Sequence, residues 1–295
     1  MKVLGFDTAT AATTVAILDQ AGPGAGLRTG TWAPPSLELQ ARDDPPRGQR
    51  PRHTTRLMAL VVELLERSGL DWPQIDRIAV GVGPGTFTGL RIGIATARAL
   101  GQARGIPLVG VSTLRSLALN ASSPPLALNA SSPPLALGAG SGPAGAQQPL
   151  GAGSGLAGAR QPAGLGAQAV LGVLDARRKE VFAAGWRLRS DECSDTGSPG
   201  QPLIAPSALA PECLAKLIGA LRCHVLALGD GAIEFRSVLE RSGALIPDDE
   251  SRLHRVTAIN HCRLAVQMPP CAPDQVQPEY LRLPDATIRR AAGTR

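Results

Sequence analysis

The sequence predicts an α/β protein built of two similar subdomains, and two β-hairpins carry this prediction. Residues 2–6 form an apolar run that returns across a polar turn as residues 13–18. The same arrangement recurs at 170–175 and 180–186, after a largely helical stretch. Apolar runs of this length are typical of buried strands. A hairpin that opens each half predicts a duplicated fold, and a hydrophobic content of 43% can support a core in both halves.

The first subdomain, expected over residues 1–112, continues with a third strand around 37–41 and a helix over 55–68 that ends near Gly69. This helix is apolar nearly all round and must therefore bury two faces. A single small subdomain seldom covers both sides of a peripheral helix. We therefore expect a partner surface that includes Leu57, Met58, Val61 and Leu65.

A glycine-rich loop then joins a strand at 78–80 to a helix over 87–103. We expect the helix to begin near Thr86 or Thr88, where a hydroxyl can cap the first turn. The loop contains no lysine and so is not a P-loop, and its glycines do not have the spacing of the dinucleotide fingerprint. Neither common type of phosphate cradle is predicted here.

Small residues recur every fourth position in this helix, at Gly89, Gly93, Ala97 and Gly101. They share one face of the helix, which is almost without side chains. Glycine inside a helix costs about 1 kcal/mol relative to alanine, so the pattern indicates a close approach of another backbone. Tight packing on the sheet of the same subdomain is one interpretation. The other, which we adopt as a prediction, is a helix–helix contact with a partner chain through Gly89, Gly93 and Ala97.

Residues 117–168 consist largely of internal repeats. LALNASSPP at 117–125 recurs unchanged at 126–134, and LGAGSGPAGAQQP at 137–149 recurs with two changes at 150–162. The segment has no aromatic residue and little charge, so it cannot bury enough surface to offset its ordering entropy. We predict a disordered, low-complexity insert.

The second subdomain is expected over residues 169–285. Its hairpin turns at Arg177-Arg178-Lys179, and a helix over 209–221 and a buried strand over 225–228 follow. Two more helices are predicted, at 233–242 and 255–267. The last of these is expected to be able to pack back on the first subdomain.

Composition narrows the function classes. The net charge of +6 permits contact with nucleic acid, but the arginines are scattered apart from a cluster between Arg42 and Arg56 that is typical of a solvated loop. The five cysteines show no CxxC spacing, which favours free thiols in a reducing compartment. No signal peptide or membrane-spanning run is recognised, so we expect a cytoplasmic protein without a membrane contact.

Gly83-Pro84-Gly85-Thr86-Phe87-Thr88-Gly89-Leu90-Arg91 resembles the signature of the bacterial TsaB family, also called YeaZ. Further segments agree with this family in chain order. They are Asp7-Thr8-Ala9-Thr10, Gly105 to Ser112, Leu174 to Arg178, and the weaker matches Gly229-Asp230-Gly231-Ala232 and Tyr280-Leu281-Arg282.

This resemblance implies the actin-like (ASKHA, ribonuclease H-like) duplicated fold. It also implies a non-catalytic scaffold subunit in the making of threonylcarbamoyladenosine in tRNA. The implied partners are a TsaD-like catalytic subunit, a TsaE-like ATPase and, through the complex, tRNA; a homodimer that uses the same helices is left open. We expect no cofactor on this chain, with ATP and metal on the partner subunits.

In actin-like ATPases the hairpin turns hold phosphate or magnesium through acidic residues. A vestigial nucleotide site would here include Asp7, Thr8, Thr10, Asp175, Gly229, Asp230 and Gly231. The arginines beside Asp175 do not suit a triphosphate, so we favour turn carboxylates bonded to local N–H groups. The alternative function is an actin-like small-molecule kinase or ATPase that uses Asp7 and Asp175, and weak nucleotide binding is left open.

No metal site is predicted. The TsaD family binds a metal through HxxxH on the helix that matches 53–68, whereas this chain has His53 followed four residues later by Leu57. One imidazole does not make that site. No GxSxG elbow or Cys/His catalytic signature is present either, so no catalytic residue is assigned.

Overall fold

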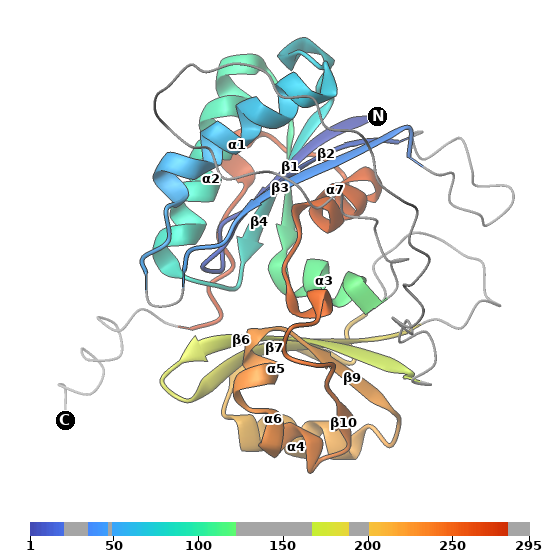
Figure 1. Cartoon of the computed structure of the whole chain (residues 1–295). Coiled ribbons are helices and arrows are strands. Elements are labelled where there is room, and N and C mark those ends of the chain that lie inside the picture. Colours follow the sequence, from blue (N-terminus) through green and yellow to red (C-terminus); the bar gives the residue numbers. More distant parts are fainter. Residues whose placement is uncertain (21–34, 47–48, 122–166, 189–200, 283–295) are drawn as a thin grey trace, which may run out of the picture. The chain divides into compact units, whose positions relative to one another are not determined.

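The computed structural model of the chain is shown in Figure 1. It describes residues 1–20, 35–46, 49–121, 167–188 and 201–282. The predicted insert therefore lies almost wholly outside the described residues. Its disorder and the predicted subdomain boundaries stay predictions.

The first five strands form one sheet with the order β3-β2-β1-β4-β5. β1 pairs antiparallel with β2, which pairs antiparallel with β3, whereas β4 and β5 are parallel to β1. Leu4 lies opposite Ile17 in the register of the first hairpin. The strands are β1 (Lys2–Asp7), β2 (Thr13–Asp19), β3 (Leu37–Asp43), β4 (Arg77–Gly83) and β5 (Leu108–Ser112).

The other five strands form a second sheet with the order β10-β9-β6-β7-β8. β6 and β7 make the antiparallel hairpin, β8 extends it, and β9 and β10 run parallel to β6. The pairing pattern of the first sheet is thus repeated, which confirms the duplicated fold that the two hairpins predict. The strands are β6 (Ala169–Arg177), β7 (Glu180–Arg187), β8 (Ile204–Leu209), β9 (Val225–Leu228) and β10 (Ala244–Leu245).

Helices cover both faces of the first sheet. Successive strand residues point to opposite faces, and in β1 the side chains of Leu4 and Phe6 join the core under α1 and α2. Gly5 points the other way, where a Cβ atom would lie 2.5 Å from Cys262 Sγ of α7. Figure 1 shows this arrangement, with α1 and α2 on one side of the strands and α7 on the other. The helices are α1 (His53–Ser68), α2 (Phe87–Arg104), α3 (Thr113–Ala118) and α7 (Ala258–Gln267).

The second sheet packs on α4 (Pro211–Ala220), α5 (Asp230–Glu234) and α6 (Arg236–Glu240). The single helix predicted over 233–242 was wrong, because α5 ends at Glu234 and Phe235 has non-helical dihedrals before α6 begins. The helix predicted from residue 255 begins at Ala258. Short 3-10 turns occur at Trp72–Gln74, Leu119–Ala121, Arg252–His254 and Pro273–Gln275.

Three elements escape the sequence patterns: β8, β10 and α3. β8 reads IAPSAL, in which Pro206 weakens the strand signal, and β10 has two residues. The capping prediction at the start of α2 was also wrong, since Thr86 is the N-cap but its side chain makes no capping hydrogen bond.

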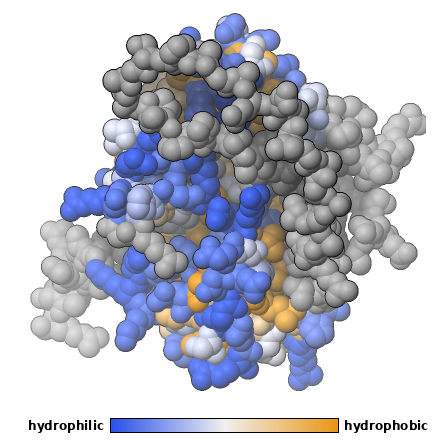
Figure 2. Space-filling model, in the orientation of Figure 1, coloured by the Kyte–Doolittle hydropathy of each residue, from blue (hydrophilic) through white to orange (hydrophobic). Residues whose placement is uncertain are grey.

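The described surface is mainly hydrophilic in the view of Figure 2, and apolar residues show mostly in the lower part, where α4 to α6 lie. Among the described residues, no helix has both the length and the apolar character needed to cross a membrane. The four cysteines that the structure describes are free thiols.

Candidate functional site

The first hairpin turn begins at Asp7, whose carboxylate is sealed inside the protein. Asp7 is 1% exposed. Its Oδ1 accepts a hydrogen bond from the N–H of Ala9 at 2.6 Å, and its Oδ2 accepts one from Thr113 Oγ1 at 2.8 Å. Strand β4 also comes very close, since a Cβ atom on Gly81 would lie 2.0 Å from Asp7 Oδ2. The local N–H bond predicted for this carboxylate is therefore present, together with a hydrogen bond from α3 and the close packing of β4.

His261 of α7 completes this enclosure. Its Nε2 lies 2.9 Å from Asp7 Oδ2, and its Nδ1 lies 2.9 Å from Ser116 Oγ of α3. Burial by itself raises the pKa of Asp7, but His261, Ala9 and Thr113 outweigh it and hold that pKa below its ordinary value. The order serine–histidine–aspartate matches that of a hydrolase triad. All three side chains are buried, however, and Ser116 also bonds to the carbonyl of Thr257, so the arrangement is a structural brace between α3, α7 and β1.

The small-residue face of α2 packs on this same turn, which corrects the predicted partner contact. Thr8 Oγ1 donates to the carbonyl of Gly89 at 2.7 Å. A Cβ atom on Gly89 would lie 1.9 Å from the carbonyl oxygen of Thr8, and one on Gly93 would lie 2.4 Å from Thr8 Oγ1. Ala97 is fully buried. The backbone that comes close is the chain's own, so the intradomain interpretation describes these residues. Thr10, also predicted for the nucleotide site, lies further along the turn and is partly exposed.

The second hairpin turn is built differently. Asp175 Oδ1 accepts a hydrogen bond from the N–H of Arg177 at 2.7 Å, and its Oδ2 lies 3.1 Å from Arg177 Nη1. Arg177, Arg178 and Lys179 all have positive φ angles, of 63°, 56° and 62°. Residues other than glycine, asparagine and aspartate rarely adopt this region. The tip therefore presents three consecutive exposed cationic residues in a strained turn.

The Gly229-Asp230-Gly231 segment was expected to approach a nucleoside, and the structure corrects this expectation. A Cβ atom on Gly229 would lie 2.1 Å from the carbonyl oxygen of Val173, and one on Gly231 would lie 2.7 Å from the carbonyl carbon of Leu174. The glycines thus admit strand β6 of the same chain. Asp230 Oδ1 in turn accepts the N–H of Asp175 at 3.0 Å and ties the segment to the second turn.

His53 occupies a structural position at the start of α1. Its Nδ1 lies 2.9 Å from Thr13 Oγ1, and burial lowers its pKa despite the opposing influence of Asp7. Leu57, four residues on, is 1% exposed in the core. Within the described ranges, no group of three or more His, Cys, Asp or Glu side chains could hold a metal ion.

The predicted face of α1 divides into a buried and an exposed part. Leu57, Val61 and Leu65 are 1%, 0% and 7% exposed and belong to the core of the first sheet, which corrects their placement on an open partner surface. Met58 is 37% exposed, and Val62, which the prediction missed, is 46% exposed. A period of 3.6 residues would have grouped these two on the outer face. Val62 also borders a pocket of about 310 Å³, which is lined by Val62, Leu65, Glu66, Gly69, Leu70, Asp71 and Trp72.

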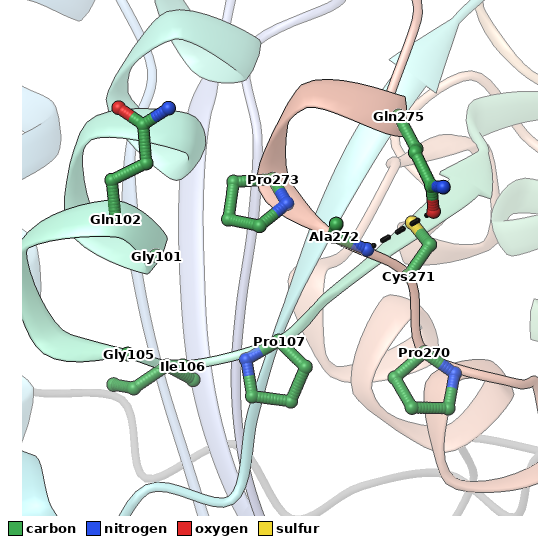
Figure 3. A pocket seen from close by; sticks show the side chains of 10 residues that line it. All are labelled: Gly101, Gln102, Gly105, Ile106, Pro107, Pro270, Cys271, Ala272, Pro273 and Gln275. Carbon is green, nitrogen blue, oxygen red and sulfur yellow. Dashed lines mark hydrogen bonds between the residues drawn. The ribbon is translucent and has the colours of Figure 1, made fainter.

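A larger and shallower pocket of about 530 Å³ lies where α2 ends and the chain enters β5 (Figure 3). No sequence pattern marks this pocket, because its walls are mostly backbone, glycine and proline. Gln275 is turned inward and accepts the N–H of Ala272. No charged side chain lines the pocket, so it offers a ligand no ionic contact. Its lining residues are Gly101, Gln102, Gly105, Ile106, Pro107, Pro270, Cys271, Ala272, Pro273 and Gln275.

Two sheets of identical topology, each opened by a hairpin with an acidic turn residue, define an actin-like two-subdomain protein. Solved structures agree with this class. YeaZ from Pseudomonas aeruginosa has a TM-score of 0.59 at 23% identity, covering 95% of this chain and 99% of that one. A P. aeruginosa protein described as uncharacterized, with similarity to peptidase YEAZ, gives 0.61 at 23% identity and the same coverage.

Sequence comparisons find similarity to TsaB and TsaD proteins. The chain is 36% identical over 121 residues to the tRNA threonylcarbamoyladenosine biosynthesis protein TsaB of Escherichia coli (strain K12), covering 41% of this chain and 44% of the relative. It is 32% identical over 123 residues to the tRNA N6-adenosine threonylcarbamoyltransferase of Sinorhizobium medicae, covering 41% and 34%. A family model described as TsaD, tRNA N6-adenosine threonylcarbamoyltransferase, matches residues 45–139. The chain thus spans under half the length of these curated relatives, and it is similar to members of both the TsaB and the TsaD families.

Proposed function

We propose that this chain is a non-catalytic subunit of the machinery that makes threonylcarbamoyladenosine in tRNA. In this role it pairs with a TsaD-like catalytic subunit and works with a TsaE-like ATPase. The reaction is inferred from the similarity to TsaB and TsaD relatives. The environment of Asp7 supports the non-catalytic part, because both of its oxygens are occupied by partners of the same chain.

One observation carries the pairing: an apolar strip on α1 that remains exposed among the residues that the structure describes. Met58 and Val62 are one helical turn apart and are exposed beside the pocket of about 310 Å³. The strip lies within residues 45–139, the region similar to the TsaD family model. Exposed apolar side chains next to a pocket are typical of protein interfaces. A second copy of this chain could use the same strip, so homodimerisation would compete with the heteromer.

The competing proposal, an ATPase or small-molecule kinase that uses Asp7 and Asp175, has less support. A catalytic carboxylate must reach a metal ion or substrate, and Asp7 is 1% exposed. At the second turn the Asp175 carboxylate is paired with Arg177. ATP turnover by the isolated chain at enzymatic rates would favour this alternative.

The pairing can be tested with Met58→Arg and Val62→Arg. Each variant places a charge on the apolar strip, so association with a TsaD-like subunit should weaken about tenfold or more while the isolated chain melts as before. Leu217→Arg is the matched control, since Leu217 is 41% exposed on α4. Isothermal titration and thermal melts give both quantities. Unchanged association in both variants would contradict the proposed surface.

A further inference from the structure

An exposed aromatic–arginine cluster lies at the start of α2, away from the buried face of that helix. Phe87 and Tyr280 stack with ring centroids 5.6 Å apart and an angle of 29° between the rings. The guanidinium carbon of Arg91 lies 3.7 Å from the Phe87 centroid, and Arg91 Nε lies 3.3 Å from Tyr280 Oη. Phe87 and Tyr280 remain 49% and 44% exposed. We call Phe87, Arg91 and Tyr280 the stacking platform.

The exposure of these rings is unusual for this chain. Aromatic residues make up 3% of the sequence, and Tyr280 is the single tyrosine. Among the described residues, Phe87 and Tyr280 are the aromatic members of the exposed large apolar side chains. The other exposed members are aliphatic and stand elsewhere, as Met58 and Val62 do on α1. The platform therefore differs in chemistry from the strip proposed for the protein partner.

The returning chain holds Tyr280 in place. The N–H of Glu279 donates to the carbonyl of Val82 at 2.7 Å, which fixes the backbone beside the end of β4. Two residues beyond Tyr280, Arg282 donates to the carbonyl of Ala176 at 3.2 Å and pairs with Glu180. The chain is thus anchored on both sides of Tyr280, so the backbone that carries this ring has little conformational entropy left to lose on binding.

These contacts also bring positive charge to the platform. Ala176 and Glu180 flank the tip of the second hairpin, where Lys179 is exposed. Arg282 neutralises Glu180 and Arg177 neutralises Asp175. Among the residues that the structure describes, no carboxylate lies within ion-pair distance of Arg91 or Lys179. Within the described part of the chain, these two cationic groups are therefore left without an internal counter-ion.

We propose that the stacking platform binds single-stranded RNA, with an unpaired base stacked on the aromatic pair and the phosphate backbone near Arg91 and Lys179. Exposed aromatic rings beside cations are the usual means of binding unpaired bases, because every base has a π face and every nucleotide a negative charge. The site's assignment to tRNA rests on the proposed function, in which tRNA is the substrate. A protein partner is the competing occupant, and the results that would overturn the inference include it.

The test measures binding of fluorescently labelled six-nucleotide oligoadenylate and oligouridylate, and of a duplex of the same length, to the full chain by anisotropy. Single strands should bind more tightly than the duplex. Phe87→Leu and Tyr280→Leu should each weaken single-strand binding about tenfold, since they keep an apolar side chain but remove the π face. Log affinity falls as log salt rises, and Arg91→Gln should make this fall less steep by about 0.7, the value for one phosphate contact on a single strand.

Matched controls separate this effect from general surface changes. Leu217→Ala and Arg241→Gln change an exposed apolar and an exposed cationic residue elsewhere and should leave RNA affinity within about twofold of the wild type. Tyr280→Phe keeps the stack and should bind like the wild type. Thermal melts of every variant identify any that fail to fold.

Three results would overturn the inference: a preference for the duplex, platform variants that bind single strands as the wild type does, or platform variants that lose only the TsaD-like subunit. The last would make the platform a protein contact. The two proposals also fail separately. RNA binding that depends on the platform, without any TsaD-like association, would contradict the proposed function and leave the RNA site standing.

Discussion

The two hairpin turns occupy the same place in two sheets of the same topology, yet they present opposite environments. In the first, β1 ends at Asp7, which is 1% exposed and surrounded by Thr113, His261 and the N–H of Ala9. In the second, the carboxylate of Asp175 is 20% exposed and its partner is the solvent-facing Arg177. The difference comes from what packs on each turn, since α3 and α7 close the first. The shared topology places an acidic residue at each hairpin turn. The elements that pack on the turn decide whether its carboxylate can reach a ligand.

The largest expected contrast between the turns is in stability. Asp7→Asn removes the charge of a buried carboxylate that accepts hydrogen bonds from Ala9 and Thr113, and it should lower the free energy of unfolding by about 1.5–3 kcal/mol. Asp175→Asn affects a partly exposed pair and should cost about 1 kcal/mol or less. Urea unfolding of both variants checks this order. Equal losses would mean that the two turns are not as different as their burial indicates.

A second contrast concerns the helix that seals the first turn. Gly93→Leu should destabilise the isolated chain by about 1–3 kcal/mol, because the new side chain meets Thr8 across a gap that is too small even for Cβ. Ala95→Leu is exposed on the same helix and should change stability by less than about 0.5 kcal/mol. Thermal melts of the two variants compare them. If Gly93→Leu melts at the same temperature as the wild type, the small-residue face would be better explained as a contact with a partner chain.

Acid should act on the first turn in two pH windows. His53 has a pKa below its ordinary value of 6.5, so its contribution to stability is present above 6.5 and is lost as the pH falls below it. Asp7 has a pKa below its ordinary value of 3.8, so its contribution is present above 3.8 and is lost as the pH falls further. His53→Gln should remove the loss of stability in the upper pH window, and Asp7→Asn should remove the loss of stability in the lower one. Stability that rises on acidification through either window would contradict these signs.

The smallest expected effect is at the tip of the second turn. Lys179 has a φ of 62°, which glycine adopts without a steric penalty. Lys179→Gly should therefore stabilise the chain by up to about 1 kcal/mol, whereas Glu212→Gly in the first turn of α4 should destabilise it by a similar amount. Chemical denaturation measures both changes. A loss of stability in Lys179→Gly would show that the lysine makes a contact worth more than the strain.

The fold could be predicted from the sequence because hairpins and amphipathic helices are local patterns. The strands at 2–6 and 225–228 and the α1 helix follow directly from apolar runs and periodicity. The candidate site depends on contacts between residues that are distant in the sequence, so it could be predicted only in part. Asp7 lies near the start of the sequence and His261 lies more than 250 residues later in α7, so no local pattern could have paired them.

The glycines illustrate the same limit. The spacing of Gly89 and Gly93 correctly indicates that another backbone comes close, but it does not say whose. Likewise, an all-round apolar helix indicates two buried faces, and the structure leaves only Met58 and Val62 as large apolar side chains exposed on α1. Spacing records that a contact exists, and only the tertiary structure identifies the other side.

The most direct test of the account is reconstituted threonylcarbamoyl transfer to tRNA with TsaD-like and TsaE-like subunits. The transfer rate should require this chain, should be nearly unchanged by Asp175→Asn, and should fall with Met58→Arg in a way that higher subunit concentration restores. Loss of transfer in Asp175→Asn at saturating subunit concentration, together with loss of ATP hydrolysis by the chain alone, would contradict the claim that these turns are structural and the chain non-catalytic.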